Sequence, residues 1–277
     1  IGLTHALSED EYILPMHRNL GVFTSRNIPL SKLFSQWQGK ASGFTKGRDR
    51  SFHFGTKDFH IVGMISHLGP QMGVADGIAL HQLINNTKKV TAVFTGDGGT
   101  SEGDFHEALN VASVWSLPVL FCIENNGYGL STTTKEQYNC KNLADKGVGY
   151  GMESHIIDGN NIIEVYHKIE KIAKDIRKKP RPILIEFKTF RIRGHEEASG
   201  VKYVPNELID TWAKKDPISN FENYLTSNDI INTEDIKTIK DSLNLEINKN
   251  LESAYKEPYP EIDIELQLSD VFKKFDF

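Results

Sequence analysis

The residues best suited to chemistry stand in two short polar segments, each of which follows an apolar run. Asp97 lies within the segment Gly96–Gly99, directly after the β-branched run at residues 90–94, and Asn125-Asn126 follow the run at residues 119–123. Carboxylate and carboxamide oxygens are ligands that Mg²⁺ accepts, commonly together with a phosphate. The glycines let backbone N–H groups approach an anion, and the N-terminus of the following helix adds its positive dipole end. Together the two segments indicate a site for a metal ion and a phosphate group.

Taken alone, each segment is equally typical of a turn, because turns favour the same residues. The surrounding elements make the metal-and-phosphate interpretation more specific. The runs at residues 90–94 and 119–123 have the character of buried parallel strands, and the helical pattern between them makes a βαβ unit. A right-handed crossover makes the strands parallel, so both polar segments leave carboxyl ends of strands, where open α/β sheets bind ligands.

The rest of the chain repeats the alternation of strands and helices. The pattern predicts α/β class: a doubly wound, mostly parallel sheet with helices on both faces and a helical C-terminal extension. We expect an α/β domain over residues 1–204, a helical extension over 205–255 and a tail or linker over 256–277. The individual elements expected are a short helix within 1–15, helices at 28–39, 69–83 and 162–178, strands at 154–158 and 182–189, a strand and loop at 61–68, and a loop at 132–150.

Composition excludes several classes of function. The 277 residues carry a formal net charge of −5 with a pI near 6.1, which offers no electrostatic case for nucleic acid. No apolar run approaches the ~20 residues that span a bilayer, so we expect no membrane partner. Cys122 and Cys140 are expected to be reduced thiols. The chain begins at Ile1 without an initiator Met, and we expect it to be part of something longer. We expect a bacterial cytoplasmic protein, with the mitochondrial matrix left open.

The two polar segments bracketing one crossover helix resemble the thiamine diphosphate signature, in which GDG and NN stand in these places. Tyr128 and the following Gly129–Thr132 narrow the match to the alpha portion of the decarboxylating component of 2-oxo acid dehydrogenase complexes. The sequence of residues 131–152 is similar to that of the branched-chain, 2-oxoisovalerate type. The resemblance covers nearly the whole chain and implies the thiamine diphosphate-binding fold.

The resemblance also implies a set of site residues, with thiamine diphosphate and Mg²⁺ as cofactors. Asp97, the Asn126 side chain and the Tyr128 carbonyl would hold the metal. Gly98, Gly99 and Arg18 would hold the diphosphate, since a guanidinium donates two bonds to paired oxygens. Ser66 and Leu68 fall where the family contacts the aminopyrimidine ring. His195 would be the catalytic histidine beside the thiazolium ring.

Three positions qualify this assignment. Without the resemblance, Arg18 is more typical of a surface arginine, and His195 is as typical of a solvated loop histidine. His17 stands where the family has tyrosine, and Glu196 stands where phosphorylated relatives have serine, so regulation at that position is unsupported. His53 is a candidate substrate-side residue, although we favour a structural role.

The function implied is oxidative decarboxylation of a 2-oxo acid, with transfer of the acyl group to a lipoyl group on the next component, an acyltransferase. The family takes the carboxylate that activates thiamine from a beta chain. We therefore expect an inactive chain that is completed by a beta subunit in an α2β2-type heterotetramer or by a fused beta portion. The alternatives are a pyruvate or acetoin dehydrogenase alpha portion and a non-catalytic assembly subunit. A transketolase-like enzyme would need a second thiamine-type domain, for which the chain is too short.

Overall fold

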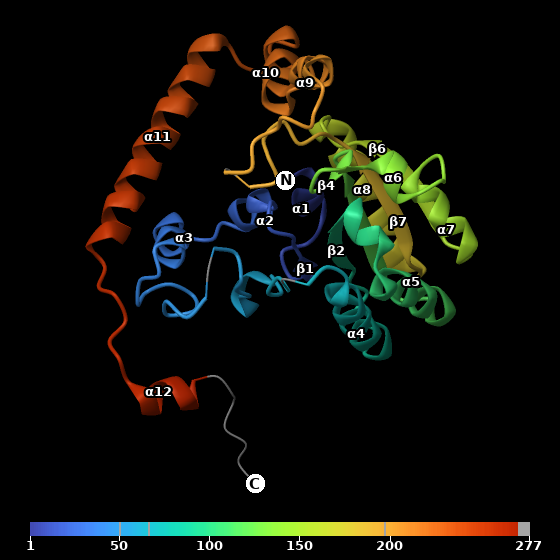
Figure 1. Cartoon of the computed structure of the whole chain (residues 1–277), viewed down its shortest axis with the longest axis horizontal. Helices are drawn as coiled ribbons and strands as arrows, with labels where there is room; N and C mark the ends of the chain where they lie inside the picture. Colours follow the sequence, from blue (N-terminus) through green and yellow to red (C-terminus); the bar gives the residue numbers. More distant parts are fainter. Residues whose placement is uncertain (50, 66, 197, 271–277) are drawn as a thin grey trace.

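The computed structural model describes residues 1–49, 51–65, 67–196 and 198–270 (Figure 1). Its centre is a five-stranded, all-parallel sheet in the order β1-β2-β3-β7-β6. The strands are β1 (Ile13–Leu14), β2 (Thr91–Gly96), β3 (Val119–Asn125), β6 (Glu153–Asp158) and β7 (Ile183–Lys188). Strands β2, β3 and β7 are buried almost throughout, which is why their sequences are continuous apolar runs.

Helices cover both faces of the sheet. On one face lie α4 (Pro70–Ile84) and α5 (Gly103–Trp115), whose small and apolar residues pack against Val93, Phe121 and Leu184. On the other face lie α1 (Gly2–Ala6), α2 (Leu20–Ser25), α3 (Leu30–Trp37) and α8 (Ile162–Lys178). This arrangement confirms the predicted α/β class and the predicted parallel sheet.

Short elements connect the strands at the carboxyl edge. The 3₁₀ turn η2 (Gly98–Ser101) follows β2, and the small antiparallel pair β4 (Tyr128–Gly129) and β5 (Thr132–Thr133) follows β3. Next come α6 (Thr134–Gln137), η3 (Leu143–Asp145) and α7 (Lys146–Gly149). The prediction of a plain loop over 132–150 was therefore wrong. Capping boxes at Thr133 and Asn142 stabilise short helical turns there.

The strand predicted within residues 61–68 is absent from the described residues of this range, 61–65 and 67–68. Ile61 makes only isolated bridges, to Ile13 and Thr56, and η1 (Lys57–Phe59) precedes it. A Cβ on Gly55 would lie 2.6 Å from the Gly63 nitrogen. This close approach of the two backbones requires glycine at position 55.

The C-terminal segment wraps around the edge of the domain (Figure 1). Helices α9 (Asn206–Ala213) and α10 (Pro217–Ser227) lie at one end, and the long α11 (Thr233–Lys256) returns beside α3. The division of the chain into three segments at residues 204 and 255 stays a prediction. In the part of the chain that is described, no helix has the length and apolar character needed to cross a bilayer.

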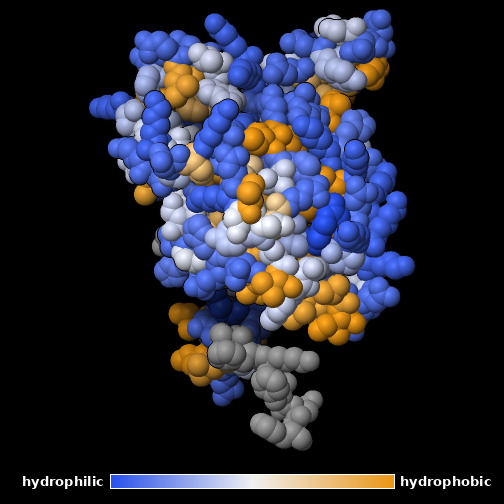
Figure 2. Space-filling view, turned by 90° about the vertical axis from the view of Figure 1, so that its right-hand side faces the viewer, coloured by the Kyte–Doolittle hydropathy of each residue, from blue (hydrophilic) through white to orange (hydrophobic). Residues whose placement is uncertain are grey.

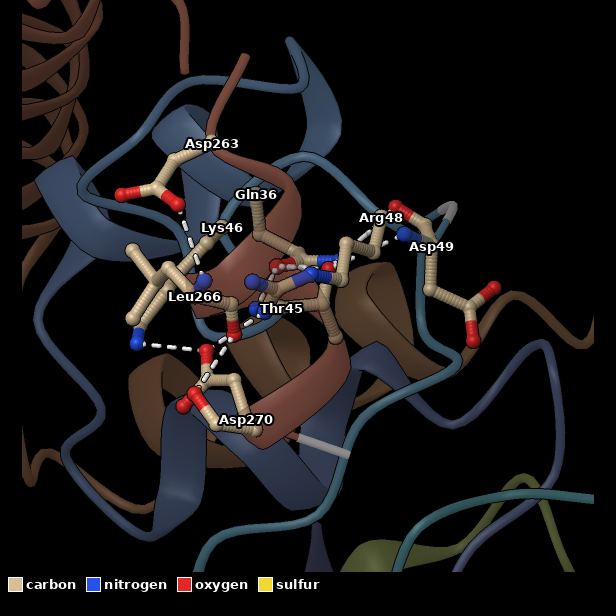
Figure 3. A network of polar contacts seen from close by, with 9 residues as sticks. Gln36, Thr45, Lys46, Arg48, Asp49, Asp263, Leu266 and Asp270 are labelled. Atoms are coloured by element: carbon tan, nitrogen blue, oxygen red, sulfur yellow. Dashed lines mark hydrogen bonds and ion pairs between the residues drawn. The ribbon is translucent and has the colours of Figure 1, made fainter. Parts of the chain in front are cut away.

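Residues 256–270 are more than an extended tail, because they include α12 (Ile264–Ser269). The Lys40 Nζ donates to the Tyr255 carbonyl at 3.1 Å. Asp270 accepts from Lys46 and Arg48, each at 2.6 Å (Figure 3). The segment is thus held against the loop at residues 40–49, although each exposed ion pair contributes little by itself.

Candidate cofactor and active site

Asp97 lies where β2 ends and η2 begins, and its side chain is only 1% exposed. Its carboxylate accepts from the Gln137 Nε2 at 3.0 Å and from the backbone N–H of Asn126. Burial raises the pKa of Asp97, whereas these hydrogen bonds and the charge of Arg191 oppose the rise. A buried carboxylate next to a second strand end is well suited to bind a cation.

The glycine turn after Asp97 is in close contact with the turn after β3. A Cβ on Gly98 would lie 3.3 Å from the Gly129 Cα, and a Cβ on Gly99 would overlap the Thr95 hydroxyl. The same Cβ on Gly99 would lie 3.9 Å from the Leu68 Cβ, so Leu68 borders this turn, and its side chain is 46% exposed. Only glycine allows the backbone to lie this close on both sides.

The two asparagines after β3 have different surroundings. Asn125 points into the protein, where its Nδ2 donates to the fully buried Glu186 at 2.6 Å. Glu186 also accepts from the Ala144 N–H at 3.0 Å and from Lys188. The Asn126 Oδ1 instead accepts from the Tyr128 N–H at 3.2 Å, next to Asp97. Asn125 therefore fixes the turn, whereas Asn126 lies beside Asp97.

Arg18 and His195, which are 177 residues apart in the sequence, lie in contact. The Arg18 Nη2 donates to the His195 carbonyl at 2.5 Å and is 3.1 Å from its Nδ1. The Nη1 of Arg191 lies 3.4 Å from the same Nδ1. Within the described residues, neither guanidinium has a carboxylate partner within 4.0 Å. Two guanidinium groups held this close together favour the binding of an anion.

This cluster fixes the protonation of His195. Arginine only donates hydrogen bonds, so the His195 Nδ1 accepts, and the neutral ring carries its proton on Nε2. Burial and the charges of Arg18 and Arg191 lower the pKa of His195. The ring is therefore neutral at physiological pH and offers an Nε2–H donor.

Hydrogen bonds join the arginine cluster to the glycine turn. The Arg191 Nη2 donates to the Leu130 carbonyl at 2.6 Å and to the Tyr203 hydroxyl at 2.8 Å. Leu130 directly follows Gly129, whose backbone touches Gly98. The Tyr203 ring in turn contacts the ring of the buried Tyr128 at 5.7 Å, edge to face. Arg191 thus ties the loop after β7 to the turn after β3.

Glu124 and Asn19 hold the segment that carries Arg18. The Glu124 Oε1 accepts from the Asn19 Nδ2 at 2.6 Å, and the Asn19 Oδ1 accepts from the Met16 N–H, also at 2.6 Å. Burial raises the pKa of Glu124, while Asn19 and Arg18 oppose the rise. His17, beside Arg18, packs edge to face against His53 at 5.3 Å. A histidine pair thus stands where the resemblance implies a tyrosine.

Comparison with known proteins identifies the family. A family model described as "Dehydrogenase E1 component" matches residues 1–263. The chain belongs to this family. Its E1 relatives include the alpha subunit of acetoin:2,6-dichlorophenolindophenol oxidoreductase from Bacillus subtilis, 33% identical over 277 residues, covering 100% of this chain and 82% of the relative.

Two further relatives are alpha subunits of mitochondrial 2-oxoisovalerate dehydrogenases. The mitochondrial 2-oxoisovalerate dehydrogenase subunit alpha of Macaca fascicularis is 33% identical over 277 residues, covering 99% of this chain and 62% of the relative. Its namesake in Caenorhabditis elegans is 36% identical over 232 residues, covering 82% and 53%. The chain thus spans less than two thirds of these mitochondrial proteins. The family match confirms the predicted resemblance.

The fold brings together those residues expected to form the site that lie in the described part of the chain. Asp97, Gly98, Gly99, Asn126 and Tyr128 surround the ends of β2 and β3, Leu68 borders them, and Arg18 and His195 join them through Arg191. Ser66 lies outside the described residues. Across the residues that the structure covers, no cluster of three or more His, Cys, Asp or Glu side chains is placed to hold a metal. The expected donor set has a single carboxylate and does not require such a cluster.

Sequence reasoning missed Arg191 and the buried supports of the site. Arg191 was visible after a predicted strand, but nothing distinguished it from Arg193 two residues later. Lys146 was also missed; its Nζ donates to the Thr100 carbonyl at 2.8 Å and holds η2 from outside. Glu186 reads as one polar residue inside a strand, and its partners lie 42 and 61 residues away.

Proposed function

We propose that this chain is the alpha portion of a thiamine diphosphate-dependent 2-oxo acid dehydrogenase. Together with a beta portion it would decarboxylate a 2-oxo acid and pass the acyl group to a lipoyl-bearing acyltransferase component. The observation that carries the proposal is the Arg18–Arg191–His195 cluster beside the Asp97-Gly98 turn. It combines a cationic site, a buried carboxylate and a neutral histidine at one sheet edge.

The residues present suit Mg²⁺ and a diphosphate. Asp97, the Asn126 side chain and the Tyr128 carbonyl would hold the metal with oxygen ligands. The N–H groups of Gly98 and Gly99, with Arg18 and Arg191, would hold the phosphate oxygens. The close backbone contact at Gly98 keeps this turn free of a side chain, since a Cβ there would lie 3.3 Å from the Gly129 Cα, and a bare backbone favours the approach of an anion. Leu68 and Ser66 would contact the aminopyrimidine ring.

When bound, thiamine diphosphate supplies the carbon nucleophile and the electron sink for decarboxylation. The contribution of this chain is position and charge. His195 would keep a proton on Nε2 and donate it as a hydrogen bond to an oxygen of the 2-oxo acid, while Arg18 and Arg191 hold the ring in place from its Nδ1 side. The carboxylate that activates the aminopyrimidine would come from the beta portion.

Branched-chain 2-oxo acids, such as 2-oxoisovalerate, are the substrates we propose. The sequence of residues 131–152 and the two mitochondrial relatives support this class of substrate. Acetoin is the second candidate, because the Bacillus subtilis relative matches over a larger share of its own length. We propose a bacterial cytoplasmic location, although relatives come both from a bacterium and from mitochondria.

A steady-state assay of the chain with its beta partner, thiamine diphosphate and Mg²⁺ tests the function. An artificial electron acceptor reports turnover of 2-oxoisovalerate, pyruvate, 2-oxoglutarate and acetoin. We expect activity only with the partner, and the highest kcat/KM for 2-oxoisovalerate. Full activity of the chain alone would refute the shared site. No turnover of any of the four compounds by a complex that binds thiamine diphosphate would refute the dehydrogenase activity.

A further inference from the structure

A groove of about 540 Å³ runs along the outer side of helices α4 and α5. It is lined by small, acidic and apolar residues, among them Gly73, Asp76, Gly77, Leu80, Val111 and Trp115. Trp115 is 53% exposed, and Val74 beside the groove is also exposed. Figure 2 views the side of the molecule that carries α5. Several separate hydrophobic patches are visible on this side, including some in its lower part.

Gly73 and Gly77 lie one helical turn apart on the exposed side of α4. A Cβ built on either glycine meets no atom within 4 Å. Packing inside this chain therefore gives no reason for glycine, which disfavours a helix relative to alanine. Two glycines at this spacing leave a flat strip of helix backbone, which lets a second helix approach closely.

Asp76 gives independent evidence of a missing partner. Its side chain is 6% exposed and lines the groove between the two glycines. Its Oδ1 has no hydrogen-bond partner in the described part of the chain. Burying a carboxylate without a donor is costly, so a donor from outside the chain is the expected remedy.

We propose that this groove receives a helix of the beta partner. That helix would present small residues to Gly73 and Gly77 and one donor side chain, such as Lys or Arg, to Asp76. This inference rests on the proposed function, because that function supplies the partner. It adds the surface on which the partner docks and the chemistry of the contact.

The charge of the groove favours a different chain over a second copy of this one. Asp104 and Glu107 add carboxylates at its rim. Two copies docked groove to groove would bring Asp76 and both rim acids into apposition, which like-charge repulsion opposes. A partner that carries positive charge at this place relieves the same repulsion.

The position of the groove also fits a partner that completes the cofactor site. Its lining includes Pro70 and Asp104, which lie in the first turns of α4 and α5. Gly69, which precedes Pro70, packs against Asp104, and Leu68 before it borders Gly99 of the glycine turn. A body that reaches the exposed side of Leu68 therefore continues directly onto the groove.

The test measures association of this chain with the beta chain of the same organism, without any activity readout. The main variant is Gly77→Leu, which adds a bulky side chain to the groove at a position where a Cβ meets no atom within 4 Å. The matched control is Gly149→Leu, at an exposed helical glycine that likewise has nothing within 4 Å. Calorimetry or sedimentation gives the dissociation constant, and circular dichroism confirms folding. We expect Gly77→Leu to weaken association at least tenfold and Gly149→Leu to leave it unchanged.

A second variant distinguishes weaker binding from a loss of folded protein. Asp76→Leu removes the unpartnered carboxylate, so we expect a chain that unfolds at a higher denaturant concentration and yet binds the beta chain more weakly. Unchanged association of both variants would overturn the proposal. So would wild-type chains that do not bind the beta chain, or that pair with each other through this groove. Activity of the complex is scored separately, so a complex that forms through the groove but turns over no 2-oxo acid refutes only the proposed function.

Discussion

Asp76 makes a quantitative prediction about the stability of the isolated chain. Burial raises the pKa of Asp76 from 3.8 to about 7. The folded chain therefore binds a proton that the unfolded chain releases between these two pH values. Stability contributed by this group is present below about pH 4, is lost as the pH rises toward 7, and changes no further above it.

The magnitude follows from the pKa difference. Each pH unit between the two values corresponds to about 1.4 kcal/mol, so the ionised carboxylate costs up to about 4 kcal/mol at pH 8. Asp76→Asn removes the charge but keeps a buried polar group without a partner, which itself costs about 1 to 3 kcal/mol. We expect the variant to exceed the wild type at pH 8 by roughly 1 to 3 kcal/mol in free energy of unfolding.

Urea denaturation at a series of pH values from 5 to 8.5 measures this difference. Other buried carboxylates with raised pKa values, Asp97 and Glu124, contribute equally to both proteins and cancel. Glu107→Gln removes an exposed negative charge from the same groove, and we expect it to change stability by no more than a few tenths of a kcal/mol. A difference between Asp76→Asn and wild type that stays constant from pH 5 to 8.5 would refute the reasoning.

Three further changes test the site. Asp97→Ala should abolish Mg²⁺-dependent binding of thiamine diphosphate to the complex with the beta chain, and unchanged calorimetric affinity would contradict the metal assignment. Arg191→Met should weaken that binding about tenfold or more through the lost charge-assisted hydrogen bonds. It should also raise the pKa of His195 and move the acidic limb of the kcat/KM profile to higher pH; an unmoved limb would separate Arg191 from His195. Glu186→Ala should lower the free energy of unfolding by about 3 kcal/mol, because it leaves buried donors unpaired, and a loss below 1 kcal/mol in urea denaturation would show that the network relaxes.

The sheet was predictable because its central strands are buried on both faces. Continuous apolar runs at β2, β3 and β7 follow directly from that burial. Strand β1 has two residues, too few for any periodicity, and only its pairing with β2 defines it. The turns between residues 132 and 150 did carry a signal, the Thr133 and Glu136 capping box, which a reading of strands and loops overlooked.

Only two kinds of candidate site residue could be predicted from the sequence: those that follow a predicted strand and those that the family resemblance implies. Asn125 and Asn126 are chemically identical in the sequence, and the difference between them comes from Glu186, 61 residues away. Arg191 becomes a site residue only because the fold places its guanidinium beside Arg18, from the other end of the domain. Long-range contacts of this kind leave no local pattern, so sequence periodicity does not reveal them.

Several charged groups of this chain are buried or clustered, which costs free energy. In each case, binding of an external ligand would lower that cost. Asp97 accepts hydrogen bonds from Gln137 and a backbone N–H, yet burial still raises its pKa, and the metal ion that we propose would oppose that rise. Burial and the nearby charge of Arg191 lower the pKa of Arg18, and an anion between the two guanidinium groups would oppose that shift. Among the described residues, the Asp76 Oδ1 has no hydrogen-bond donor. Because these charges are not fully compensated within the described residues, they support the cation, the diphosphate and the partner chain that we propose as ligands. The same electrostatic argument therefore describes both the cofactor half-site and the docking groove, and it explains why this chain should act only in a complex.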